Sequence, residues 1–156
     1  MKPTTLILLF ITTCILGCNQ PTSSDYTTPL EAKKTTDGIG YTLSIPKAVY
    51  ALSDTLQLSF RVQNESNRLK EFGFANQQQF GFQLTDASGT IALSYPSIFL
   101  PAGSGFVLRP GESKLFSTSW LFKNHNGNFI NRSDYRLSGY LTEGKSPAVS
   151  LQISVK

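Results

Sequence analysis

The chain has 156 residues and a formal net charge of +4, with 14 basic and 10 acidic residues dispersed along it. A small net charge without a basic stripe argues against a nucleic-acid partner. The spacing of the acids and of the single histidine suggests no metal site. No glycine-rich loop leads into a helix that could hold a phosphate, so no cofactor is predicted.

The first eighteen residues have the layout of a secretory signal. Lys2 precedes a nearly continuous apolar run from Leu6 to Leu16, and Gly17-Cys18 follows. This ending resembles the box of bacterial lipoprotein signals, in which a small residue precedes a cysteine. The resemblance implies that residues 1–17 are removed and that Cys18 carries acyl chains, two of which suffice for stable anchoring. A plain secreted protein is the alternative, because the apolar run is too short for an uncleaved membrane span.

Residues 18–36 are predicted to be a flexible tether behind the lipidated cysteine. They are rich in Thr, Ser and Pro and lack any hydrophobic period. Cys14 would leave with the signal and Cys18 would be acylated, so no thiol would remain for a disulfide or a nucleophile. The expected location is the cell envelope, outside the cytoplasm. Asn19 stands where an aspartate is associated with inner-membrane retention, so by resemblance the outer membrane is favoured in a two-membrane cell.

Residues 37–156 form one domain with the pattern of strands. Apolar and polar residues alternate strictly over 56–62, 135–141 and 149–155, and more briefly over 41–45, 72–74, 80–84, 91–95 and 114–120. Turn signals separate these runs at 64–67, 86–89, 109–112 and 125–128. No window of helical length has an apolar stripe with a period of 3.6. The pattern predicts an all-β fold, an immunoglobulin-like antiparallel β-sandwich of about seven to eight strands.

Several segments of the domain share a spacing that is more specific than any single motif. They are Val62-Gln63-Asn64-Glu65-Ser66, the run 74–82, Leu108-Arg109-Pro110-Gly111-Glu112-Ser113, Trp120, and the strand that Tyr135 opens. Together they resemble the BsuPI-type intracellular proteinase inhibitor domain. The resemblance implies a β-sandwich and a proteinase as partner. The chain departs from that family at Gly81, where an aspartate is usual, and at 92–95, where a tryptophan-containing strand is usual.

The segment 94–106 carries no charge at all, although a loop in this position would normally be polar. Two interpretations are open: the segment packs Ile98, Phe99 and Leu100 into the core, or it exposes an apolar patch for binding. In the second case Phe99 or Leu100 would fill the specificity pocket of a protease, between Pro96 and Pro101. The candidate binding residues are Tyr95, Ile98, Phe99, Leu100 and Phe106.

No catalytic residue is predicted. His125 lies in a turn among asparagines and a glycine, where a solvated side chain is a better interpretation than a general base. Without it no Ser–His–Asp triad can be assembled, and the acids are scattered singly rather than paired. The sequence therefore predicts a lipid-anchored extracytoplasmic binding domain that is not an enzyme. Its partner would be a subtilisin-like serine protease that it inhibits, or an envelope protein that it binds as a non-inhibitory structural or interaction module.

Overall fold

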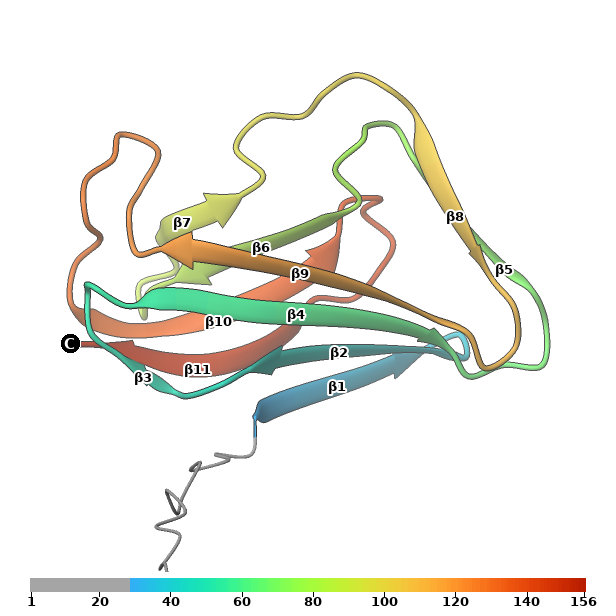
Figure 1. Cartoon of the computed structure of the whole chain (residues 1–156), viewed down its shortest axis with the longest axis horizontal. Coiled ribbons are helices and arrows are strands. Elements are labelled where there is room, and N and C mark those ends of the chain that lie inside the picture. The colour runs from blue at the N-terminus through green and yellow to red at the C-terminus, as the bar shows by residue number, and fades with distance from the viewer. Residues whose placement is uncertain (1–28) are drawn as a thin grey trace, which may run out of the picture.

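The computed structural model describes residues 29–156, which form eleven strands arranged as two packed sheets and a two-stranded ribbon (Figure 1). No stretch of these residues is a helix long and apolar enough to cross a membrane. The predicted signal and Cys18 lie outside the described residues. The strands are β1 (Leu30–Thr36), β2 (Ile39–Ile45), β3 (Val49–Tyr50), β4 (Thr55–Asn64), β5 (Lys70–Phe74), β6 (Phe80–Thr85), β7 (Ile91–Tyr95), β8 (Ser104–Leu108), β9 (Ser113–Leu121), β10 (Ser133–Leu141) and β11 (Val149–Val155).

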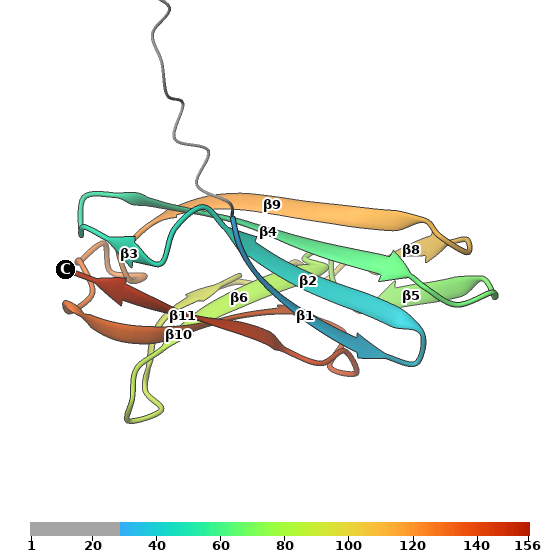
Figure 2. The ribbon, with the colours of Figure 1, turned by 90° about the horizontal axis from the view of Figure 1, so that it is seen from below.

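The two sheets lie face to face as a sandwich, seen edge-on in Figure 2. The first has the order β1-β2-β4-β9 and is antiparallel throughout; the second has the order β3-β11-β10-β6-β7 and is antiparallel except where β3 pairs with β11. Alternation along the longer inner strands turns apolar side chains into the space between the layers, as at Leu56, Leu58, Phe60 and Val62 of β4. The predicted all-β sandwich is confirmed.

Three of the strands, β1, β3 and β8, were not predicted from the sequence. β3 has only two residues, too few for a visible alternation. β8 begins inside the uncharged segment 94–106, for which the sequence predicts a loop, and Ser94 and Tyr95 belong to β7, so the loop itself spans 96–103. The small residues Ser104 and Gly105 conceal the strand period of β8.

The third missed strand, β1, corrects the predicted boundary between tether and domain. Residues 30–36 pair with β2 over their whole length, so the tether ends before Leu30 rather than at Thr36. β1 is almost entirely exposed. Two kinds of contact hold it in place: the backbone hydrogen bonds to β2, and an ion pair of 2.5 Å between Lys33 and Glu65. A strand held in this way buries little apolar surface and therefore shows no hydrophobic period.

Asn64, at the end of β4, is fully buried and joins four parts of the chain. Its Nδ2 donates to the carbonyl oxygens of Arg68 (2.7 Å) and Leu108 (2.9 Å), and its Oδ1 accepts from the backbone N–H (3.0 Å) and hydroxyl (2.7 Å) of Ser66. Its carbonyl accepts from the N–H of Gly111 at 2.8 Å. One buried side chain thus ties the end of β4 to the turn before β5 and to the end of β8, with every polar atom satisfied.

Replacing Asn64 by Asp should remove the two donors and place carboxylate oxygens against the carbonyls of Arg68 and Leu108. We expect a loss of about 3 kcal/mol or more in the free energy of unfolding, because buried polar groups are left unpaired. Urea denaturation measures this loss. Asn67→Asp, the same change at an exposed site in the same turn, is the control and should stay within about 0.5 kcal/mol of the wild type. Equal effects of the two changes would contradict the role given to Asn64.

Glu143, in the turn after β10, gives the stability a pH dependence. Burial raises the pKa of this carboxyl above its ordinary value, and the ammonium of Lys145 only partly opposes the effect. A raised pKa in the folded state means that ionisation of Glu143 costs stability once the pH exceeds the ordinary, unfolded-state pKa.

Glu143→Gln should therefore raise the melting temperature at pH 7. The gain should vanish below the ordinary glutamate pKa of 4.5, where the wild-type carboxyl is protonated in both the folded and the unfolded state. Thermal melts from pH 3 to pH 8 test this. Glu71→Gln, on the exposed face of β5, removes the same charge and controls for net charge. A gain that persists unchanged at pH 3 would contradict the assignment.

Candidate binding loop

The loop 96–103 joins β7 to β8 along the side of the sandwich where β7 and β9 are the edge strands (Figure 1). Ile98, Phe99 and Leu100 expose 73%, 52% and 51% of their surface. The interpretation that packs these three residues into the core is therefore wrong, and the segment presents an apolar patch. A contiguous exposed patch of large apolar side chains is typical of a binding surface.

The backbone of the loop is held by the turn between β5 and β6. Leu100 is fixed at both polar atoms: its N–H donates to Oε1 of Gln78 at 2.9 Å, and its carbonyl accepts from the N–H groups of Gln77 (3.4 Å) and Ala102 (2.8 Å). The hydroxyl of Thr142 donates to the carbonyl of Gln78, which ties the turn to the end of β10. These glutamines position the apolar patch. Sequence reasoning assigned them no such role, because no pattern links residues that are 22 positions apart.

Tyr95 and Phe106 support the loop rather than form its exposed tip. The Tyr95 ring packs between Phe82 and Trp120, at centroid distances of 5.7 Å and 5.4 Å. Both candidate residues are only partly exposed and pack against the core. Of the five residues predicted to bind, three are displayed and two hold the ends of the segment in place.

Phe106 belongs to an aromatic row that fastens the β5–β8 ribbon to the sandwich. Its ring stacks on those of Phe72 (4.5 Å) and Phe74 (5.7 Å), and it lies 6.0 Å from Phe116 of β9. The Phe116 ring in turn stacks on Phe80 of β6 at 5.7 Å. Buried aromatic pairs of this kind add to the stabilisation from area alone. The row fixes the ribbon to which the loop connects.

Gly81, where the resembling family usually carries an aspartate, has no room for a side chain. A Cβ atom there would lie 2.8 Å from Cε2 of Tyr140 and 2.8 Å from the carbonyl oxygen of Tyr95. An aspartate at position 81 would therefore collide with the Tyr140 ring and the Tyr95 backbone, so the packing beside the loop requires glycine here.

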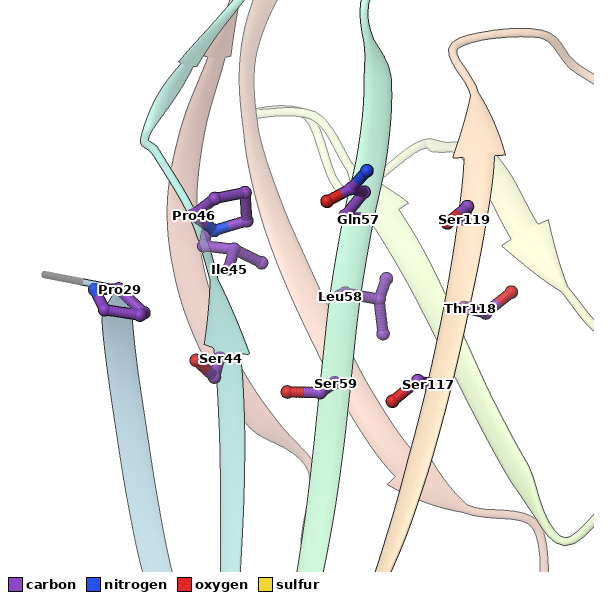
Figure 3. A pocket seen from close by; sticks show the side chains of 10 residues that line it. All are labelled: Pro29, Ser44, Ile45, Pro46, Gln57, Leu58, Ser59, Ser117, Thr118 and Ser119. Carbon is purple, nitrogen blue, oxygen red and sulfur yellow. The ribbon is translucent and has the colours of Figure 1, made fainter. Parts of the chain in front are cut away.

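A depression lies on the outer face of the first sheet, shown in Figure 3. Ser44, Ser59 and Ser117 stand side by side on β2, β4 and β9, and small or uncharged residues surround them. No charged side chain lines this depression. The hollow thus presents hydroxyl groups with no charged side chain among the residues that line it.

His125 lies in the exposed loop after β9, as its turn signal predicted. Its Nε2 is 3.4 Å from Oγ of Ser94 on β7, a proximity that residues 31 positions apart do not announce in sequence. No carboxylate among residues 29–156 hydrogen-bonds to this imidazole, and no group of three or more His, Cys, Asp and Glu side chains in that range could hold a metal ion. Within residues 29–156 the pair lacks the carboxylate that orients a catalytic histidine and stabilises its protonated form.

Comparison with protein families identifies the domain. The model of the BsuPI family, described as an intracellular proteinase inhibitor, matches residues 43–145. The chain belongs to the BsuPI family. The match begins within β2 and ends after β10, so it covers most of both sheets, the β5–β8 ribbon and the exposed loop. A comparison with curated proteins finds no match.

Solved structures similar to this BsuPI protein are distant. A CARDB domain from Pyrococcus furiosus is 14% identical, with 77% of this chain and 97% of that chain covered and a TM-score of 0.43. A β-glucosidase from Erythrobacter marinus is 15% identical, with 76% of this chain covered and a TM-score of 0.46. The BsuPI chain spans only 15% of the length of that enzyme. Neither similarity bears on what the chain binds or does.

Proposed function

We propose that this protein is a lipid-anchored extracytoplasmic binding domain that inhibits subtilisin-like serine proteases through the loop 96–103. Membership of the BsuPI proteinase inhibitor family supports the kind of partner. The observation that carries the proposal is the exposed, uncharged patch of Ile98, Phe99 and Leu100 on a backbone that the neighbouring turn holds in place.

Inhibition would work by substrate mimicry. An extended segment pairs with the backbone at the edge of the protease cleft, and one side chain enters the specificity pocket. Phe99 suits that pocket better than Leu100, because both backbone polar atoms of Leu100 are already bonded within the domain, whereas those of Phe99 have no partner among residues 29–156.

The contacts of the loop also favour slow release. Because Leu100 is fixed through Gln77 and Gln78, little conformational freedom is lost on binding. Pro96 and Pro101 restrict the backbone on both sides. The tertiary amide between Leu100 and Pro101 would be a poor bond to cut, as an inhibitor requires.

The anchor would keep this activity at the membrane. By the proposal Cys18 is acylated, and residues 19–29 connect it to β1. Such a short segment would hold the domain within about 20 Å of the lipid surface. The protein would thus protect the envelope against proteases that reach it from outside the cytoplasm.

A second function is favoured by Gly81. The Tyr140 ring fills the space that a side chain would need there, so the surface beside the loop differs from the usual family pattern. If the aspartate of other members takes part in inhibition, this chain would instead be a non-inhibitory structural or protein-interaction module of the cell envelope, and it would retain a stable partner that is not a protease.

Phe99→Asp separates folding from binding. Because Phe99 is half exposed, the variant should melt close to the wild type while its inhibition constant for a subtilisin-like protease rises about 30-fold or more. Phe129→Asp is the matched control: Phe129 is 51% exposed in a different loop, and the variant should inhibit like the wild type. Inhibition assays with the chain from Asn19 onward test this. If no serine protease is slowed at micromolar concentration and the domain is degraded, inhibition is excluded.

Cys18→Ser tests the anchor independently of the loop. The variant should lose its acyl chains and move from the membrane fraction to the soluble fraction, or accumulate as an uncleaved precursor. Cell fractionation with mass spectrometry of the N-terminal peptide measures both. Cys14→Ser, a change within the predicted signal, should leave the protein in the membrane. Unchanged membrane partitioning of the Cys18→Ser variant would show that the signal is not a lipoprotein signal.

A further inference from the structure

β9 is an open edge of the first sheet. It pairs with β4 on one side, and on its other side the sheet has no further strand among the described residues (Figure 1). Outside the β4 ladder, no backbone hydrogen bond within residues 29–156 involves residues 114–120. A strand of nine residues with one free side presents a row of unpaired N–H and C=O groups to any other chain.

The other edges of the two sheets carry the usual protections against pairing, and β9 does not. β1 bears the charges of Glu31, Lys33 and Lys34; β3 has two residues; β7 has five residues and pairs with β6 through a register shift. The only charged residue of β9 is Lys114 near its start, whose ammonium lies 4.5 Å from the centre of the Phe106 ring. Residues 115–121 are uncharged.

The sequence of this uncharged stretch reads alike in both directions. Leu115-Phe116-Ser117-Thr118-Ser119-Trp120-Leu121 has a leucine at each end, then an aromatic residue, then a serine, with Thr118 at the centre. Leu115 and Leu121 are 56% and 46% exposed on the outer face, although leucine on a sheet edge is a hazard unless something covers it.

We propose that the occupant of this edge is a second copy of the chain, paired antiparallel with its twofold axis at Thr118. In this register Leu115 opposes Leu121 of the other copy, Phe116 opposes Trp120, and Ser117 opposes Ser119. Every residue therefore meets one of its own kind, as suits an isologous twofold interface. Matched apolar, aromatic and hydroxyl pairs are the contacts that stabilise neighbouring strands.

Hollows border β9 at the centre of the proposed pairing. Thr118 and Ser117 line hollows on both sides of the edge: the serine-lined depression of Figure 3, and a groove bordered by Tyr95 and residues 77–80. Pairing would join two four-stranded sheets into one continuous sheet of about eight strands. The pairing uses residues of β9 and none of the loop 96–103, so its tests do not depend on the proposed inhibition.

The twofold axis also suits a membrane-bound protein. Antiparallel edge pairing places the axis normal to the sheet, so the outer faces of both first sheets point the same way. Pro29 lines the depression on that face, so both chains enter the dimer from the same side. Two copies anchored in one membrane must both enter the dimer from the membrane side, as this arrangement allows. Tethering to the membrane also raises their effective concentration.

Cysteine cross-linking in membranes tests the register with the full chain. Thr118→Cys should form a disulfide-linked dimer under mild oxidation, because directly opposed residues of antiparallel strands have Cα atoms about 4.5–5.5 Å apart. Leu115→Cys should cross-link with Leu121→Cys when the two are co-expressed, but not with itself. Ser59→Cys on the inner strand β4 is the control, and the unmodified chain, with only Cys14 and Cys18, gives the background. If the Thr118→Cys variant cross-links to a different polypeptide, or to nothing, the proposal is overturned.

Charge pairs on the outer face provide a second test in detergent solution. Ser117→Lys with Ser119→Lys opposes two like charges and should weaken dimerisation about tenfold or more. Ser117→Lys with Ser119→Glu has the same sites changed but opposes unlike charges, so it should dimerise like the wild type. Sedimentation velocity measures both. A wild-type chain that stays monomeric at the highest concentration, or equal loss in both variants, overturns the proposal.

Discussion

The hydrogen bonds of Asn64 are the constraint on which the rest of the molecule depends. A buried amide can be tolerated only when its donors and acceptors are paired, and here the partners come from the turn between β4 and β5 and from the end of β8. No apolar side chain could replace it, because the carbonyls of Arg68 and Leu108 would then lose its two donors. The amide thus fixes the base of the β5–β8 ribbon against the sandwich.

The β5–β8 ribbon connects the site of Asn64 to the candidate binding loop. One end of it is held at Asn64, and the row of stacked rings around Phe106 fastens its length to β9 and β6. The loop 96–103 joins its other end, where Gln78 and Thr142 hold it. A display of three large apolar side chains to solvent is unfavourable by itself, and it persists here because the backbone beneath is fixed from both sides.

The loop 96–103 and the edge strand β9 expose apolar groups in different ways. The loop exposes the side chain of Phe99, and the backbone N–H and C=O of this residue have no hydrogen-bond partner within residues 29–156. This arrangement suits insertion into the cleft of another protein. β9 presents a whole row of backbone groups and a self-matching sequence, which suits addition of a like strand. Pairing along β9 uses backbone groups of β9, and insertion into a cleft uses Phe99, so the two proposals draw on different residues.

The sequence by itself determined the strands whose side chains alternate, because period-two burial leaves a pattern at β4, β10 and β11. It also determined the turns, as at 86–89, where Asp86 accepts from the N–H groups of Ser88 and Thr90, and it singled out the uncharged segment around Phe99. Only the tertiary structure decided the rest. β1 is held by its backbone ladder and the Lys33–Glu65 pair rather than by burial, so no pattern announced it. An apolar sequence at 98–100 is compatible with a buried or an exposed segment. The hydrogen bonds of Gln77 and Gln78 to Leu100 hold the backbone so that these side chains are exposed. Alternation in β9 tells which face is inward but not which strands are its neighbours, since a central strand and an edge strand have the same period.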